Sequence, residues 1–219
     1  RLYILAKLNK LNLIDNNIVT YDFTINENKD HLKEIPKIEE NEVLDFTELK
    51  KYILDLQINN DKKFYDFQDL QNLYGVMHED ASVYEDSMFS FISETSFLEN
   101  EFYISEKVVK ALGQNHPFIV FGNVGTLKEL KRIGFKTFEP FIDESYDLEP
   151  NIQKRIDMVF VEVLKLVKKT EEEKLEWMKN IKPILEKNYK VLRNLFYNHK
   201  KQIKDNETNL KMLASNYLI

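Results

Sequence analysis

The feature that most constrains the fold is a repeated strand–turn–helix pattern in the middle of the chain. Pro117–Phe121 ("PFIVF") is a continuous apolar run of strand length, which is typical of a parallel strand covered on both faces. A second short apolar run, Met88–Ile92 ("MFSFI"), precedes it, and a helical pattern separates the two. Two successive β–α units predict a right-handed, doubly wound parallel sheet of the Rossmann-like α/β class.

Each predicted strand is followed by a short amphipathic helix with recognisable ends. Ser105 is a favourable N-cap for a helix over 106–113, because its hydroxyl can accept a bond from a free N–H of the first turn. After the second strand the glycines of 122–125 form a turn. Thr126 is then a candidate cap for a helix that stops at Gly134.

The flanking segments predict helices and loops around this α/β unit. The strand Met88–Ile92 places Ser93 and Glu94 at its carboxyl end. We divide the chain into a Rossmann-like domain over 1–165 and a C-terminal helical extension over 166–219. The remaining elements are predicted from apolar spacing and from breakers: a helix at 2–13, a strand at 18–23, a polar loop at 26–42, one or two short helices within 43–75, and long amphipathic helices at 151–169 and 171–204.

Composition excludes several classes of function. A chain of 219 residues with 43% hydrophobic residues is long enough to bury a core. Its formal charge of -6 argues against a general polyanion binder, which needs a broad positive face. The absence of cysteine excludes disulfides, thiolate metal sites and a cysteine nucleophile. No apolar run reaches the roughly 20 residues of a membrane span, so we expect a soluble, cytoplasmic protein.

The carboxyl ends of the predicted strands are where a ligand is expected. In doubly wound sheets ligands bind beyond these ends, where helix N-termini present free N–H groups and a partial positive charge. Ser93–Glu94, Tyr103–Lys107 and Gly122–Thr126 all fall at such positions. The window 105–136 carries a net charge of +4 within an acidic chain, which favours an anion as the ligand.

Glu106 and Lys107 are the residues of this region with the clearest chemistry. A lysine in the first turn of a helix opposes the helix dipole, but it becomes useful when a phosphate is bound there. The neighbouring carboxylate can accept bonds from the hydroxyls of a ribose or another sugar. The same residues also fit an ordinary capped helix start with a solvated charge pair, and spacing alone favours that plainer interpretation.

The same residues resemble a known family. The string "YISEK" (Tyr103–Lys107), followed by an apolar helix and "HPFIVFGNVGTLKELKRIGF", is similar to the donor-binding half of fucosyltransferase-like glycosyltransferases, with phage and bacterial relatives. Tyr103, Glu106 and Lys107 match that family's Tyr-x-x-Glu-Lys motif, and Pro117 with Gly122 matches the strand that follows. The likeness covers residues 87–147 well. Ser93-Glu94-Thr95 departs from the family's Glu-Asn-Ser order.

The resemblance implies half of a two-domain GT-B glycosyltransferase. The N-terminal acceptor domain, which carries the catalytic base in the family, would be missing from this chain, so no catalytic residue is assigned. The implied donor is a nucleotide-diphosphate sugar, with a GDP-sugar favoured by analogy. The transfer would be inverting, would require no cofactor or metal, and would act on an unknown glycan, protein or nucleic acid. The expected donor-binding residues are Tyr103, Glu106, Lys107, Glu94, Ser93, Gly122, Asn123, Gly125, Thr126 and, for the diphosphate, Arg1.

Three alternatives remain open at this point. Asp143, Glu144 and Asp147 are candidates for a divalent-cation site, although loop caps and solvated charges are the commoner use of such residues. His116 is a candidate donor to a base or phosphate, against the commoner fate of a turn histidine with a local hydrogen bond. The whole chain also fits a non-catalytic nucleotide-binding or protein-interaction module derived from a transferase domain, with its long C-terminal helices as the contact surface.

Overall fold

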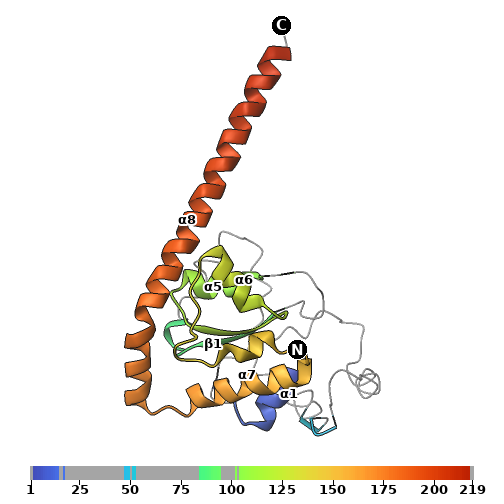
Figure 1. The fold of residues 1–219 in the computed structure, drawn as a ribbon, viewed down its shortest axis with the longest axis vertical. Helices are drawn as coiled ribbons and strands as arrows, with labels where there is room; N and C mark the ends of the chain where they lie inside the picture. The colour runs from blue at the N-terminus through green and yellow to red at the C-terminus, as the bar shows by residue number, and fades with distance from the viewer. Residues whose placement is uncertain are drawn as a thin grey trace.

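The computed structural model describes residues 2–14, 17, 47–49, 51–52, 84–94, 102 and 104–217, with the backbone alone over 205–217. Within these ranges the chain is a mixed α/β structure in which helices predominate (Figure 1). The predicted strand at 18–23, the loop at 26–42 and most of the helical segment 43–75 lie outside the described residues, as do Arg1 and Tyr103.

The described elements follow the predicted order along the middle and the end of the chain. They are α1 (Leu2–Lys10), β1 (Ser90–Ser93), α5 (Glu106–Gly113), β2 (Phe118–Phe121), α6 (Thr126–Ile133), the 3-10 helix η3 (Glu144–Leu148), α7 (Ile152–Val167) and α8 (Glu171–Tyr217).

β1 and β2 form a parallel pair, as the two apolar runs predict. Ser90 lies opposite Phe118, and the register continues to Ser93 opposite Phe121. The pairing extends one residue beyond the strands, because the N–H of Glu94 donates to the carbonyl of Phe121 at 2.9 Å. These are the two strands of the sheet within the described residues, so the parallel α/β unit is confirmed and a larger doubly wound sheet stays a prediction.

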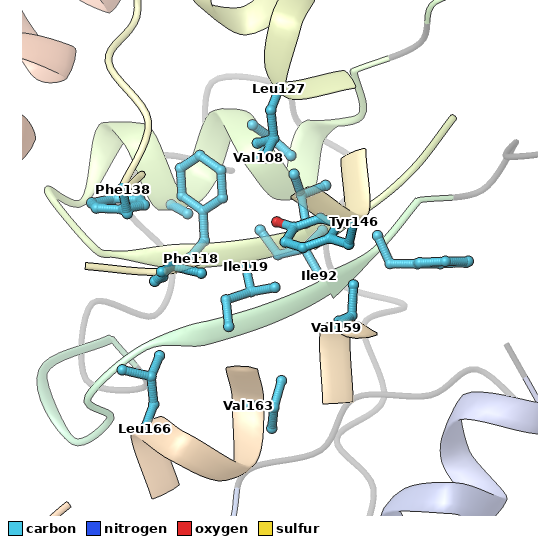
Figure 2. Packing of buried hydrophobic residues seen from close by; sticks show 14 of the residues in the cluster. Ile92, Val108, Phe118, Ile119, Leu127, Phe138, Tyr146, Val159, Val163 and Leu166 are labelled. Carbon is cyan, nitrogen blue, oxygen red and sulfur yellow. The ribbon is translucent and has the colours of Figure 1, made fainter. Parts of the chain in front are cut away.

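Helices cover both faces of this strand pair (Figure 2). Val108 of α5 and Leu127 of α6 pack above the strands, and Val159 and Val163 of α7 pack below them. All four residues of β2 are buried, which explains why its sequence is uninterrupted by polar residues. The helices α5 and α6 on one side and α7 on the other therefore define three layers, with the core centred on β2.

The helix ends follow from local sequence in most cases. Ser105 caps α5 as predicted, because its hydroxyl accepts a hydrogen bond from the N–H of Lys107 at 3.3 Å. Helix α6 ends at Gly134, which has a φ of 109° and so takes a left-handed conformation that other residues adopt only at a cost. Asn151 caps α7 by accepting from the N–H of Lys154 at 2.9 Å.

Helix α1 packs against α7, although about 150 residues separate them in the sequence. Gln153 donates a hydrogen bond to the hydroxyl of Tyr3, and Lys7 forms an ion pair with Asp157. The side chains of Tyr3 and Ala6 are buried in the core. The predicted helix at 2–13 is thus confirmed, with an end at Lys10, and it is joined to α7 by these two contacts.

Helix α8 begins in the core and then leaves it. Trp177, Ile181, Leu185 and Leu192 are buried, and this proximal part packs against α5. The distal part of the helix runs on past the body of the molecule to Tyr217 (Figure 1). The structure therefore extends the predicted helix of 171–204 to Tyr217. Among the residues that the structure describes, no helix combines the length and the apolarity that crossing a membrane requires.

Replacing Asn188 by alanine is expected to loosen the proximal part of α8 from the body. The buried Asn188 side chain accepts from the N–H of Lys136 at 2.7 Å and donates to its carbonyl at 2.8 Å. Loss of both bonds leaves two backbone groups without partners, so the free energy of unfolding should fall by about 2 kcal/mol. Urea denaturation measures this loss. Asn194→Ala, at an exposed position of the same helix, is the matched control, and an equal loss there would contradict the assignment.

Candidate functional site

The parallel register brings two of the predicted site segments to one edge of the strand pair. Ser93 and Phe121 are paired at the carboxyl ends of β1 and β2, so Glu94 and Gly122 both follow at the same edge. The start of α5 lies at this edge too, because Glu94 accepts a hydrogen bond from the backbone of Ser105. The edge thus assembles Ser93, Glu94, the 122–126 turn and the first turn of α5, as the sequence predicts.

Glu94 is the most deeply buried charged residue of this edge. Its side chain has no exposed surface, and its Oε1 accepts from the N–H of Ser105 at 2.9 Å. Its second carboxylate oxygen, Oε2, has no hydrogen-bond partner within the described residues. A buried carboxylate oxygen without a donor is costly, so Glu94 retains the capacity to accept one more hydrogen bond at the start of α5.

Glu106 and Lys107 form an ion pair with each other at the surface. Lys107 Nζ lies 2.7 Å from Glu106 Oε1, and the two side chains keep 38% and 52% of their surface exposed, respectively. Partial burial raises the pKa of Glu106, but the hydrogen bond and the charge of Lys107 outweigh it, so the pKa lies below its ordinary value. The geometry is that of a solvated pair, and both charged groups remain accessible to a ligand.

The start of α6 is already bound by a carboxylate of the chain itself. Asp147 accepts from the N–H of Leu127 at 2.9 Å and from that of Lys128 at 3.2 Å, and its carbonyl accepts from Gly125 at 2.8 Å. Burial raises the pKa of Asp147, and the hydrogen bonds that its carboxylate accepts from the backbone N–H groups of Leu127 and Lys128 oppose that shift. A negative charge at a helix N-terminus is stabilised by the helix dipole, and here Asp147 provides that charge.

Thr126 is not the N-cap of α6, which corrects one prediction. The cap position is Gly125, at a φ of 84°, and Thr126 is the first helical residue. Its N–H and its hydroxyl both donate to the carbonyl of Asn123, at 3.1 and 2.8 Å. The threonine hydroxyl also explains Gly122, where a Cβ would lie only 2.6 Å from Thr126 Oγ1. The N–H groups of Gly125, Thr126, Leu127 and Lys128 are therefore engaged within the chain.

Arg155 joins this edge, and the sequence prediction missed it. The side chain is 3% exposed, its guanidinium lies 5.2 Å above the ring of Phe121, and its Nη1 donates to the carbonyl of Glu149 at 3.5 Å. Burial lowers the pKa of Arg155, while the charges of Asp147 and Glu149 oppose that shift. A usable signal existed, because Arg155 falls on the apolar stripe of its helix between Ile152 and Ile156.

The three acidic residues of the 143–147 segment have separate structural roles. Asp143 caps η3 by accepting from the N–H of Ser145 at 3.0 Å. Glu144 accepts from the hydroxyl of Thr137 at 2.6 Å and from the N–H of Phe138 at 2.7 Å. Asp147 holds α6. Within the described ranges no group of three or more His, Cys, Asp or Glu side chains is placed to hold a metal ion.

His116 lies at the opposite edge of the strand pair from these residues. It precedes β2 rather than following it, and its ring packs edge-on against Tyr84 at 5.1 Å. It is 5% exposed, and burial lowers its pKa to about 4, against the raising effect of the carbonyls of Phe89 and Tyr84. A neutral core histidine at the amino end of β2 cannot reach a ligand at the carboxyl end, so we remove it from the candidate site.

The basic window is largely compensated by acidic partners. Lys131 bonds Glu139 at 2.8 Å and lies 3.4 Å from Glu144, and Arg132 bonds Glu129 at 2.5 Å. The Glu139 and Glu144 partners come from beyond the window, so counting charges within it overstates the local positive potential. An anion at this edge would therefore have to be bound by particular side chains more than by a general positive potential.

The fold and the site define a structural class, the parallel α/β proteins, but they assign the chain to no protein family. The described residues form a parallel α/β unit. Its carboxyl edge carries the buried carboxylate of Glu94 and the exposed Glu106–Lys107 pair, together with the start of α6, whose N–H groups are bound by Asp147. No family model, no curated protein and no solved structure matches the chain.

Proposed function

We propose that this chain is the donor-binding domain of a nucleotide-sugar-dependent glycosyltransferase, within a doubly wound, GT-B-type arrangement. One observation carries the proposal: the accessible Glu106–Lys107 pair lies at a helix start directly beyond the carboxyl edge of two parallel strands. That edge is where α/β folds bind nucleotides. The family resemblance of the Tyr103–Lys107 motif supports the same assignment.

The proposed site is centred on α5 rather than on the 122–126 turn. Its residues are Ser93, Glu94, Glu106 and Lys107, to which the motif adds Tyr103. A diphosphate at the start of α6 would meet the Asp147 carboxylate, and the N–H groups there are engaged. The repulsion between an anion and Asp147 disfavours that position. Gly122, Asn123, Gly125 and Thr126 therefore shape the edge in this proposal and leave the phosphate contact to Lys107.

Lys107 and Glu106 divide the recognition of the donor between them. Lys107 Nζ leaves Glu106 and binds the donor diphosphate as a point charge, and the Glu106 carboxylate then accepts from ribose or sugar hydroxyls. The exchange costs little, because an exposed ion pair contributes about 0–1 kcal/mol. Positive charge from Lys107, and from Arg1 if it reaches the site, stabilises the departing diphosphate as the sugar is transferred. No metal or other cofactor is assigned a role.

The rest of the proposal follows from the family analogy alone. The transfer is inverting, the donor is a GDP-sugar in the first instance, and the protein acts in the cytoplasm. The acceptor is a glycan, protein or nucleic acid. An acceptor domain N-terminal to this chain supplies the catalytic base.

Calorimetric titration of the full chain with GDP, UDP and their sugars tests the proposal. Binding of at least one of these ligands is expected, and Lys107→Ala should weaken it roughly tenfold or more, since a hydrogen bond to a charged group contributes about 1.5–3 kcal/mol. Glu106→Ala should weaken binding of the sugar nucleotide through its lost hydroxyl contacts.

The matched control is the Glu171–Lys174 pair at the start of α8. Its Nζ–Oε1 distance is 2.6 Å and its Glu and Lys side chains are 86% and 32% exposed, so it resembles the Glu106–Lys107 pair in distance and chemistry. Lys174→Ala and Glu171→Ala should leave donor binding unchanged. The proposal fails if no ligand binds, or if the two pairs respond alike.

A non-catalytic module derived from such a domain is the second candidate, and the length of α8 favours it. Among the described side chains of α8, Leu192 is the last buried one, and the helix continues for 25 residues beyond it. The two candidates differ in one measurement on the protein that joins this chain to the proposed acceptor domain: a transferase hydrolyses bound sugar nucleotide slowly to free sugar when no acceptor is present, and a non-catalytic protein leaves it intact.

A further inference from the structure

The distal part of α8 carries a regular stripe of residues, whose members up to Ile203 are exposed. The stripe begins at Phe196, continues with His199 and Ile203, and both apolar members are exposed, at 41% and 46%. By its spacing the sequence extends the same line along the described helix. We call this set the α8 seam; its members are Phe196, His199, Ile203, Asn206, Leu210, Leu213 and Tyr217.

The spacing of the α8 seam is that of a coiled coil. Its steps alternate strictly between three and four residues over three heptads, which is the 3.5-residue period that keeps a seam facing a partner helix. In heptad terms Phe196, Ile203, Leu210 and Tyr217 occupy the a positions, and His199, Asn206 and Leu213 occupy the d positions. The period identifies the partner as another helix rather than a flat surface or a sheet edge.

The composition of this helix also requires a partner. Residues 193–217 include five asparagines, together with threonine and serine, all poor helix formers. A lone helix in water is marginal even when built from good helix formers, and most helices are stabilised by packing an apolar face. Within the described residues, buried side chains of α8 end at Leu192. Over 193–204, the distal residues whose side chains the structure describes, α8 therefore lacks the packing that such a sequence needs.

We propose that the α8 seam pairs with the same seam of a second copy of this chain, in a parallel, in-register coiled coil. The polar members of the seam identify the partner. Opposite an unrelated apolar helix, His199 and Asn206 would be buried against apolar groups, which is costly. Opposite a second copy in parallel register, each polar residue lies at the level of its own counterpart. Asn206 then faces Asn206 of the other chain, and a hydrogen bond between them favours the in-register alignment, as a buried asparagine at an a position does in other coiled coils.

The flanking positions are compatible with this pairing. In a parallel pair the residue before each a position meets the residue after the next d position of the partner. These pairs are Leu195 with Lys200, Gln202 with Glu207, and Asn209 with Ala214. None joins like charges. The long stem of Lys200 can cover Leu195, which is 42% exposed in the single chain. An antiparallel pair would instead place Ile203 opposite Asn206, so the polar residues of the seam would no longer face their own counterparts.

Sedimentation of the full chain over a range of concentrations tests the proposal. A monomer–dimer equilibrium is expected. Phe196→Glu with Ile203→Glu should weaken it by roughly two orders of magnitude, because two charges enter the seam. The control is Tyr197→Glu with Asn198→Glu, which adds the same charge at exposed positions off the seam and should leave the equilibrium unchanged. A strictly monomeric chain, or equal responses of the two double variants, overturns the proposal.

The register has its own test, which uses the absence of cysteine from the chain. Ile203→Cys places one thiol at an a position, where parallel in-register partners bring the two thiols close enough to form a disulfide on oxidation. Tyr197→Cys, off the seam, should not cross-link. A dimer that fails to cross-link through residue 203 contradicts the parallel register, even if it still associates. Neither dimerisation nor its register depends on donor binding, so loss of sugar-nucleotide binding in Lys107→Ala would neither support nor contradict the coiled coil.

Discussion

Lowering the pH from 7 to about 4 is expected to reduce the free energy of unfolding through one buried residue, His116. Burial lowers the pKa of His116 to about 4 in the folded chain, whereas an unfolded histidine titrates near 6.5. Below about pH 6.5 the unfolded state takes up a proton on this histidine and the folded state does not. The free energy of unfolding therefore falls as the pH is lowered, until the pH reaches the folded pKa. The difference corresponds to about 3 kcal/mol.

Urea denaturation at a series of pH values between 7 and 4 measures this dependence. His116→Phe keeps a ring against Tyr84 but cannot take up a proton, so its stability should fall less steeply over the same range, whatever its stability at pH 7. Parallel pH profiles for the wild type and His116→Phe would show that His116 does not carry the effect.

The second large effect is expected for Asp147→Ala. This substitution removes the acceptor of two backbone N–H groups at the start of α6 and the negative charge beside the buried Arg155. Loss of a cap costs about 0.5–2 kcal/mol, and loss of one partner of a buried charge adds to it. We expect the free energy of unfolding to fall by about 3 kcal/mol.

Asp143→Ala provides the comparison, because Asp143 is also a capping aspartate, four residues earlier in the chain. It accepts one backbone N–H, from Ser145, and its position is exposed. Its loss should cost about 1 kcal/mol or less. Thermal or urea unfolding of the two variants side by side measures the difference. Equal losses would mean that burial and the charge interaction with Arg155 add nothing to the role of Asp147.

Local sequence was sufficient wherever an element depends on its own residues. Phe118–Phe121 has no polar residue because both of its faces are covered, and Ser105 caps the helix that it precedes. The parallel pairing followed from two strands separated by a helix. Each of these features is encoded within a few positions, so spacing and residue type were enough to predict it.

The candidate site was only partly predictable, because its decisive contacts join distant positions. Asp147 lies 20 residues from Leu127, whose N–H it binds, and nothing in the 122–126 turn shows that its helix is already capped. Glu94 reaches Ser105 across 11 residues, most of them outside the described chain. His116 was placed near the site by sequence proximity, although a strand carries its two ends to opposite edges.

By itself the sequence determined the α/β class, the order of the described helices and strands, the cap of α5, and the edge at which Glu106 and Lys107 stand. These depend on periodicity and on short-range hydrogen bonds. Only the tertiary structure decided which helix N-terminus is occupied by a carboxylate, that Arg155 is buried over Phe121, and that the buried positions of α8 end at Leu192 among its described side chains. Those outcomes depend on which distant side chains the packed layers bring together, and burial then sets the free energy of each charge.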